Sequence, residues 1–404
     1  MQTSDITRYP YAAVLGRNRL LSLAELRALG GLDGRTFMVE PAGMQAALLG
    51  RGFTPETARQ LGGSTKVVRI AGVASSPEEA IQALTADVTR STKFSFGVSV
   101  YGRADAGRLA RQAKRALKQN NASVRYVPTE RQAKSLSTAQ VLHNGLLKDG
   151  YEWGLIEHGR REWHYGRTVW IQDLEAFGKR DYDKPSNDPR RGMLPPKLAR
   201  TMLNLSGLPA GKSIYDPFCG SGVVLMEARL LGLTPFGSDI SPKAVSDTKR
   251  NLQWLAQEYD VSRSAKLEVA DASAPLPFKS DAIVTEGYLG HPVRENTSFP
   301  EILNEQRQVE SLVTQFLKRA HAALPIGGRL VLTVPLWRLP HSGDRRIRAI
   351  DGAARLGYTK VRCVPDGLSG PELTERESLL VSRPKQRVVH ELYVLEKRGE
   401  PVQN

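Results

Sequence analysis

A short segment near the middle of the chain combines residues suited to holding a nucleoside. Residues 213–222, with the sequence Ser-Ile-Tyr-Asp-Pro-Phe-Cys-Gly-Ser-Gly, run from a short apolar strand into a glycine-rich turn. Gly220 and Gly222 let the backbone approach a ligand that a Cβ atom would block, and residues 223–231 predict an apolar helix whose first amides face that ligand. Asp239 follows Gly220 by nineteen residues. It ends the next expected strand, where an acid holds a ribose diol in a Rossmann-like sheet.

The spacing of these glycines indicates which nucleoside the segment could bind. It is not the Gly-x-Gly-x-x-Gly spacing of dinucleotide sites, and no Gly-Lys-Ser/Thr follows, as nucleoside triphosphates require. S-adenosylmethionine is the nucleoside that is left. The alternative is that Gly220 and Gly222 only form a tight turn and that Asp239 caps a helix starting near Ser241. Cys219, inside the turn, is expected to be a small packing residue rather than a nucleophile.

The sequence Asp-Pro-Phe-Cys-Gly-Ser-Gly at 216–222 resembles the first motif of class I S-adenosylmethionine-dependent methyltransferases that modify amino groups of RNA or DNA. The resemblance implies that Asp216 and the two glycines surround the methionine part of the cofactor, Asp239 the ribose, and Asp271-Ala272 the adenine. The residues expected to bind the cofactor are Asp216, Pro217, Cys219, Gly220, Gly222, Asp239, Ile240, Asp271, Ala272 and Thr285. Because Cys219 and Cys363 are the two cysteines of the chain, we predict no disulfide framework and no metal site.

The end of the fourth strand of the catalytic part is the expected reaction centre. Amino methyltransferases carry Asp or Asn, two prolines and an aromatic residue there, whereas this chain reads Thr285-Glu286-Gly287-Tyr288. Glu286 and the carbonyl of Gly287 could hold an exocyclic amine, and Tyr288 could stack on the base. Glutamate is one methylene longer than aspartate and glycine lacks the fixed φ of proline, so a shift of about 1 Å could cost about a hundredfold in rate. The alternative is an inactive descendant; His291, nearby, is expected to be incidental.

Positive charge is concentrated in the first half of the chain. Residues 1–200 contain 31 Lys and Arg against 19 Asp and Glu, a net charge of +12 out of the total of +15. Within one expected helix, basic residues recur at intervals of three and four and so share a face: Arg108, Arg111, Lys114, Arg115 and Lys118. Leu109, Ala113, Ala116 and Leu117 form its apolar face. A polyanion, here RNA, is the expected partner, and the alternative is a solvated helix face of a basic protein.

The first 178 residues predict α+β structure in two regions. Residues 1–75 alternate short strands and helices between glycine pairs, and residues 76–178 follow the order helix, strand, basic helix, strand, helix and hairpin. Gly159 suits the turn of that hairpin, between expected strands at 152–157 and 162–172. This order, directly before a methyltransferase motif, resembles the THUMP-type RNA-binding modules of tRNA-modifying enzymes. We therefore expect an N-terminal α+β domain at 1–75 and a THUMP-like RNA-binding domain at 76–178.

The linker expected at 179–196 carries a more specific resemblance. Residues 180–205 run from a polar, proline-rich segment into an amphipathic helix that starts after Pro196. This stretch and the terminal segment 383–396 resemble the corresponding parts of the THUMP-containing tRNA guanosine N2-methyltransferases. In methyltransferases such a helix closes one side of the cofactor pocket; the alternative for Pro195-Pro196 is a helix start without ligand contact.

Strands and helices alternate regularly through the expected catalytic domain at 197–404. The predicted strands are 214–215, 235–238, 267–270, 282–285, 329–334, 360–364 and 388–395, and the predicted helices include 242–255, 305–323 and 345–356. The expected fold class is α/β: a Rossmann-like, seven-stranded class I methyltransferase sheet, mostly parallel with one antiparallel edge strand, preceded by the α+β THUMP-like region.

Length and composition limit the class of protein further. A chain of 404 residues holds two or three domains. There is no apolar run of about 20 residues for a membrane span and no apolar signal core, so we expect a cytoplasmic protein without a membrane partner. The predicted function is S-adenosylmethionine-dependent methylation of a guanosine N2 amine in RNA, with tRNA as the expected substrate. The alternatives are a DNA amino methyltransferase and an RNA-binding protein with a catalytically silent methyltransferase fold; a partner subunit is left open.

Overall fold

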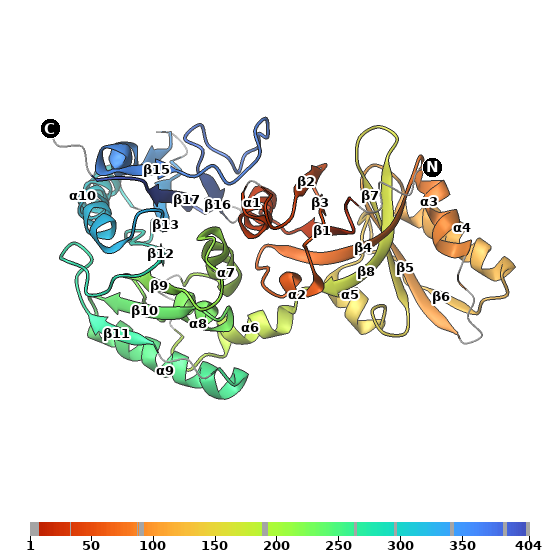
Figure 1. The fold of residues 1–404 in the computed structure, drawn as a ribbon, viewed down its shortest axis with the longest axis horizontal. Coiled ribbons are helices and arrows are strands. Elements are labelled where there is room, and N and C mark those ends of the chain that lie inside the picture. The colour runs from red at the N-terminus through yellow and green to blue at the C-terminus, as the bar shows by residue number, and fades with distance from the viewer. Residues whose placement is uncertain are drawn as a thin grey trace. The chain divides into compact units, whose positions relative to one another are not determined.

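The computed structural model describes residues 8–32, 34–86, 88, 93–187, 193–261, 265–294, 297–339, 343–382 and 386–400. The chain divides into two compact units, an N-terminal unit (Met1–Asp173) and a C-terminal unit (Leu174–Asn404), which Figure 1 shows in red to yellow and in green to blue. The finer division at 1–75, 76–178, 179–196 and 197–404 stays a prediction. Residues 188–192 of the expected linker and 383–385 of the terminal segment lie outside the described residues.

The N-terminal unit is built on one mixed sheet. Its strands are β1 (Tyr11–Leu15), β2 (Val39–Ala42), β3 (Ala46–Leu49), β4 (Ser64–Ala74), β5 (Phe94–Tyr101), β6 (Val124–Tyr126), β7 (Tyr151–Glu157) and β8 (Trp163–Ile171), in the order β2-β3-β1-β4-β8-β7-β5-β6. β5 pairs in parallel with β6 and β7. The hairpin expected around Gly159 is present, because β7 and β8 pair antiparallel and Gly159 adopts φ +75°.

Five helices accompany this sheet among the described residues: α1 (Arg19–Gly30), α2 (Pro55–Ala58), α3 (Pro77–Ala86), α4 (Ala106–Gln119) and α5 (Thr138–His143). α4 is the expected basic helix. Leu109, Ala113 and Leu117 are fully buried as expected, and Ala110 joins them. Ala116, expected on the apolar face, is only partly buried. α5 is short because Asn144 caps it and Gly145 turns the chain at φ +63°.

The C-terminal unit is built on a second sheet. Its strands are β9 (Ser213–Asp216), β10 (Thr234–Asp239), β11 (Lys266–Val269), β12 (Ala282–Thr285), β13 (Arg329–Trp337), β14 (Arg345–Arg346), β15 (Tyr358–Lys360), β16 (Leu379–Val381) and β17 (Val388–Lys397). The main order is β11-β10-β9-β12-β13-β17-β15, with β14 on β13 and β16 on β17. β9 to β13 are parallel, and β17 is antiparallel to both neighbours.

Two sequence expectations for this sheet need correction. The antiparallel strand does not lie at the edge, because β15 lies outside β17. β17 is almost wholly buried along its length, and a buried strand needs backbone partners on both sides. The helix expected at 345–356 is instead the short strand β14, paired with the end of β13, followed by a 3-10 helix at Ala349–Leu356.

The helices of this unit are α6 (Leu174–Tyr182), α7 (Pro196–Leu205), α8 (Val223–Leu230), α9 (Pro242–Tyr259) and α10 (Phe299–Ala323). α10 begins six residues before the sequence expectation, because Ser298 and Glu301 form a capping box and Pro300 fits the first turn. α10 and the 3-10 helix pack on the sheet through an apolar cluster that includes Tyr215, Phe316 and Trp337. Within the described residues, the helices lack the combination of length and hydropathy that a membrane span needs.

Candidate functional site

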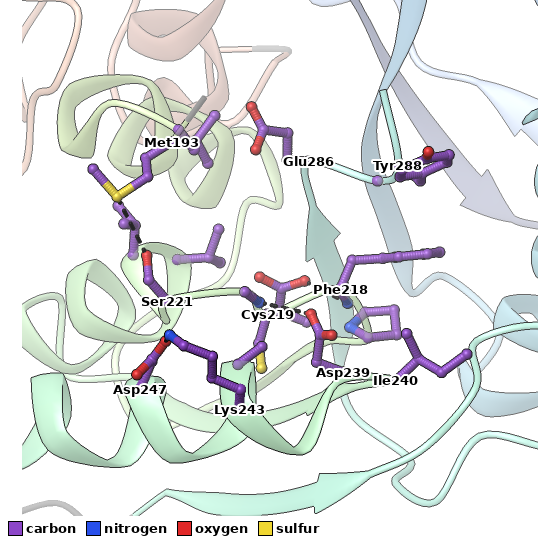
Figure 2. Close-up of a pocket in the computed structure, with 18 of the residues that line it drawn as sticks. Met193, Phe218, Cys219, Ser221, Asp239, Ile240, Lys243, Asp247, Glu286 and Tyr288 are labelled. Atoms are coloured by element: carbon purple, nitrogen blue, oxygen red, sulfur yellow. Dashed lines mark hydrogen bonds and ion pairs between the residues drawn. The ribbon is translucent and has the colours of Figure 1, made fainter. Parts of the chain in front are cut away.

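A cavity of about 660 Å³ opens at the ends of β9, β10 and β12 in the C-terminal unit (Figure 2). This volume lies in the range of small-molecule sites, and its position at the carboxyl ends of parallel strands is where α/β folds bind ligands. The structure brings these predicted residues together in its lining: Asp216, Pro217, Cys219, Gly220, Asp239, Ile240, Asp271, Ala272, Glu286, Gly287 and Tyr288. Gly222 and Thr285 are not in the lining.

The glycine-rich turn shapes one wall of this cavity. Gly220 adopts φ +53° and Gly222 φ +84°, conformations that L side chains rarely adopt. A Cβ atom on Gly222 would also lie 2.8 Å from Cγ2 of Thr248. Gly222 is the N-terminal cap of α8, so the turn directs the first amides of that helix toward the cavity wall. The positive φ angles of this turn therefore require glycine at both positions.

Asp239 holds the turn to the next strand with both carboxylate oxygens. Oδ2 accepts a hydrogen bond from the Gly220 amide at 3.0 Å, and Oδ1 accepts one from the Ser241 amide at 2.9 Å. The cap of α9 is Ser241, whose Oγ accepts from the Ala244 amide. Because a carboxylate can accept about four hydrogen bonds, Asp239 can still receive hydroxyl groups from the cavity.

Asp216 lies at the end of β9 with 2% of its surface exposed. It accepts a hydrogen bond from the Phe218 amide at 3.0 Å. Burial raises the pKa of this carboxyl to about 7, while hydrogen bonds from Thr285 and Phe218 oppose the rise. Thr285 is fully buried and does not line the cavity. It contacts Asp216 through a side-chain hydrogen bond instead. Near neutral pH, therefore, a charged group placed beside Asp216 would decide whether this carboxyl is protonated or ionised.

Cys219 lies in the same turn and is 5% exposed. Burial raises the pKa of its thiol well above the ordinary value, so the nucleophilic thiolate is disfavoured. Its sulfur lies 3.7 Å from Oγ1 of Thr248. These contacts agree with the packing role expected from the sequence.

Residues after the end of β12 form the opposite wall of the cavity. One of them, Glu286, pairs with a histidine of a distant strand, a contact that the sequence does not reveal. Oε1 of Glu286 lies 2.7 Å from Nε2 of His390, a residue of β17. The two side chains are 21% and 13% exposed, so the pair is largely shielded from water. The backbone carbonyl of Glu286 accepts from Oγ1 of Thr333 at 2.5 Å. Glu286 is therefore held at both its side chain and its main chain.

Gly287 follows with φ +70°, where the prolines usual in the family could not be accommodated, because proline fixes φ near −65°. A Cβ atom on Gly287 would lie 2.8 Å from the Thr333 carbonyl. A proline here would therefore require a different backbone conformation after β12.

Tyr288 is 38% exposed and is held by a small polar cluster. Its hydroxyl donates to Oε1 of Glu305 at 3.2 Å, and Nδ1 of His291 lies 2.9 Å from Oε2 of the same glutamate. Burial and the Glu305 carboxylate raise the pKa of Tyr288 to about 12, so the phenol stays neutral. His291, expected to be incidental, helps to anchor the tyrosine.

The segment before the catalytic sheet also contributes to the cavity. Met193 and Leu194, which precede α7, are in its lining (Figure 2 labels Met193). The lining contains neither Pro195 nor any residue of α7, all of which the structure describes, so it is the linker, and not the helix expected from the sequence, that borders the cavity. α6, α7 and α8 are joined by buried ion pairs: Glu227 accepts from Nε of Arg180 at 2.5 Å and from Nε of Arg200 at 2.7 Å. Glu227 itself is fully buried.

Fold and site together define a class I methyltransferase domain. A family model described as "RMKL-like, methyltransferase domain" matches residues 185–340. The tRNA (guanine(10)-N2)-dimethyltransferase of Methanothermobacter thermautotrophicus is 38% identical over 171 residues, 42% of this chain and 46% of that enzyme. A protein of Methanothermococcus thermolithotrophicus named "Probable tRNA (guanine(10)-N2)-dimethyltransferase" is 33% identical over 112 residues, 27% of this chain and 69% of that protein.

Similarity to a solved structure extends over nearly the whole chain. The crystal structure of TrmN from Thermus thermophilus aligns with a TM-score of 0.54 at 19% identity, covering 96% of this chain and 99% of that one. This likeness confirms the expected fold class. The chain belongs to the S-adenosylmethionine-dependent methyltransferase family that contains the tRNA guanine N2-methyltransferases, and S-adenosylmethionine is the cofactor of this family. The chain spans about half the length of three of the curated relatives that it matches.

Proposed function

We propose that this protein transfers a methyl group from S-adenosylmethionine to the exocyclic N2 amine of a guanosine in tRNA. The observation that carries the proposal is that Glu286, Gly287 and Tyr288, which we assign to the amine, line the same cavity as Asp216 and Asp239, which we assign to the cofactor. The relatives named for guanine N2 methylation in tRNA support the choice of substrate. The two alternatives, DNA and a silent fold, become outcomes of the test.

The lining fits this cofactor. Ile240 leaves 70% of its surface exposed beside Asp239, an apolar face for adenine next to an acceptor for ribose hydroxyls. Asp271 and Ala272, also in the lining, are assigned to the adenine, and the acid Asp216 suits the ammonium of the methionine part. When bound, the cofactor supplies an electrophilic methyl group. The residues of the chain then have to bring an amine into line with it.

The amine would be held at the end of β12. The Glu286 carboxylate accepts one N–H of the amine, the Gly287 carbonyl accepts the other, and Tyr288 stacks on a base that has left its helix. His390 fixes the direction of the Glu286 carboxylate through the 2.7 Å contact. The same Glu286–His390 pair lies where it can take the proton that the amine loses as the new bond forms. Catalysis would rest on positioning rather than on a covalent enzyme intermediate.

A methyl-transfer assay tests the proposal. Purified protein is incubated with S-adenosylmethionine and either unmodified tRNA or duplex DNA, and the nucleosides are analysed by mass spectrometry. We expect N2-methylguanosine from tRNA and no methylated base from DNA. Asp239→Ala is the control, because loss of a charge-assisted acceptor should weaken cofactor binding by roughly 1.5 to 3 kcal/mol. Cofactor binding without transfer to any nucleic acid would favour the silent fold, and methylated DNA would favour the second alternative.

Cofactor affinity should depend on pH through Asp216. Its raised pKa of about 7 means that the free protein holds the proton below neutral pH. A bound ammonium favours the carboxylate, so binding must release that proton. We expect the dissociation constant to rise about tenfold for each pH unit below pH 7, since one unit corresponds to about 1.4 kcal/mol.

Calorimetry between pH 5.5 and about 8 provides the measurement, with Asp216→Asn as the matched control. Asparagine cannot titrate, so its curve should lack the slope below neutrality. Ionisation of the cofactor's own amine affects both proteins equally and cancels in their ratio. Parallel curves for the two proteins would show that Asp216 does not contact the methionine part.

RNA binding is assigned in this proposal to α4. Arg111, Arg115 and Lys118 are exposed there, and Lys114 is partly so. Arg108, the fifth predicted residue, forms an ion pair with Glu78 and therefore offers less charge to a phosphate. The THUMP-like module at 76–178 and a cytoplasmic location belong to the same proposal.

Replacing Arg111, Lys114, Arg115 and Lys118 with glutamine should weaken binding to every tRNA and flatten its dependence on salt. If all four neutralise phosphates, the slope of log K against log salt should decrease in magnitude by about 3. Filter binding at several salt concentrations measures this slope. The control for net charge is a variant in which four lysines of the C-terminal unit are likewise replaced with glutamine: Lys212, Lys249, Lys279 and Lys318. Equal slopes for wild type and the α4 variant would leave α4 as a solvated face.

A further inference from the structure

The β7–β8 hairpin of the N-terminal unit (Figure 1) has three polar side chains close together near its turn: His158, Glu162 and His164. Glu157 pairs with Trp163 and Ile156 with His164, and the His158 amide donates to the Glu162 carbonyl at 2.8 Å. His158 and Glu162 are therefore directly opposite, and His164 lies one diagonal step away on the same face. The register of the hairpin itself brings these three side chains together.

The atoms of this cluster face one another at distances close to those of a metal site. Oε1 of Glu162 lies 3.2 Å from Nδ1 of His158 and 2.7 Å from Nε2 of His164. All three ligand atoms lie within 4.8 Å of one another. Tetrahedral zinc with bonds of about 2.1 Å separates its ligands by about 3.4 Å. Small side-chain movements would therefore bring the three atoms to one ion.

A further carboxylate completes the arrangement around His158. Nε2, the ring nitrogen that points away from Glu162, lies 3.3 Å from Oε1 of Glu40, a residue of β2. The Tyr9 hydroxyl donates to the other oxygen of Glu40. Histidines that bind metals usually donate their second ring N–H to a carboxylate, which fixes the tautomer and strengthens the ligand. Glu40 is in that position, with its own orientation fixed by Tyr9.

The location and charge of the cluster also suit an ion. β2 and β7 are not neighbours in the strand order, but Ala42 of β2 and Ile156 of β7 belong to one buried apolar cluster, and Glu40 of β2 contacts His158 just after β7. Glu40 and Glu162 together balance a dication. His164 is 2% exposed, whereas Glu162 is 46% exposed, which leaves an approach from solvent. The cations nearby are Arg8, over the Tyr9 ring at 5.1 Å, and the exposed turn residues Arg160 and Arg161.

We propose that His158, Glu162 and His164 bind a divalent transition-metal ion, with zinc as the ion that fits their chemistry, and that Glu40 orients His158 for it. Two imidazoles and a carboxylate, with a water molecule in the fourth position, are a ligand set that zinc accepts. The ion would fasten the turn of the β7–β8 hairpin to β2. All residues of this site belong to the N-terminal unit, whereas those of the methyltransferase cavity belong to the C-terminal unit.

The test uses the full chain without an affinity tag, after treatment with a chelator. Zn²⁺ is titrated by calorimetry, and Co²⁺ is followed by its visible absorption, which reports tetrahedral coordination. We expect one ion per chain. Glu162→Gln and His158→Gln should each weaken binding by at least about tenfold, and Glu40→Gln should weaken it by about 10- to 100-fold. The three substituted residues are partly exposed, so the fold should tolerate them.

His143→Gln is the matched control, because His143 is an exposed histidine of α5 in the same unit. Its affinity for Zn²⁺ should equal that of the wild type. Circular dichroism verifies that each variant is folded. No saturable Zn²⁺ binding by the wild type, or equal binding by wild type and folded Glu162→Gln, overturns the proposal and leaves the cluster as a hydrogen-bonded group that closes the sheet.

Discussion

Replacing Glu286 with alanine is expected to lower the turnover of methyl transfer by about 10² to 10³-fold, the loss typical of one positioned charge-stabilising group. In the proposed mechanism its carboxylate would hold the amine as positive charge develops on the nitrogen, an interaction that would be strongest in the transition state. Affinities for S-adenosylmethionine and tRNA should hardly change. Single-turnover measurements at saturating concentrations of both ligands determine the effect.

His390 should affect the reaction only by orienting Glu286, so the effects of replacing the two residues should not add. His390→Ala should reduce turnover less than Glu286→Ala, and the double variant should be no slower than Glu286→Ala alone. Glu286→Asp keeps the charge but shortens the side chain, so it should lose the 2.7 Å contact with His390 and fall between wild type and alanine. If wild type and Glu286→Ala methylate tRNA equally fast, Glu286 has no role in the reaction.

The cofactor side of this cavity could be predicted from the sequence because its determinants are local. Gly220 and Gly222 need their positive φ within one turn, and Asp239 reaches the turn across adjacent parallel strands. A single motif thus contains most of the geometry. Which of these residues touch the cofactor is still a prediction, since the structure gives their positions around the cavity alone.

The amine side could not be predicted in the same way. His390 lies 104 residues after Glu286, and the two meet because β17 inserts between β13 and β15 rather than at the sheet edge. A sequence pattern of apolar residues does not distinguish an inner from an outer strand position. The path of Gly287 likewise depends on Thr333, which lies on the neighbouring strand β13.

The sequence predicts the presence of α4 and α10 better than it predicts where they begin or what they contact. The capping box of Ser298 and Glu301 marks the start of α10, six residues before the apolar periodicity becomes clear. The spacing of basic residues on α4 correctly separates an exposed face from the buried Leu109 and Leu117. The Arg108–Glu78 pair, between residues of two helices, is a tertiary contact that spacing cannot reveal.

Glu227→Ala should be the most destabilising of the substitutions considered, at about 3 to 5 kcal/mol, because it leaves two buried guanidinium groups without their carboxylate. Arg180 and Arg200 both bind Glu227, and both lie over the ring of Phe177, at 4.5 and 5.1 Å. Removing the acid therefore loosens α6 and α7 together. Urea unfolding of the full chain, with hydrogen exchange of the α8 amides to follow the C-terminal unit, measures the loss.

Glu258→Ala is the matched control. Glu258, a residue of α9, pairs at the surface with Lys179, which lies on α6 beside Arg180. An exposed pair contributes little, so its removal should hardly change the unfolding curve. The contrast extends to the cavity: Met193 and Leu194 line it directly before α7, so Glu227→Ala should also weaken S-adenosylmethionine binding while Glu258→Ala should not. Equal stability of the two variants would mean that the buried guanidinium groups find other partners and that α6 and α7 do not depend on Glu227.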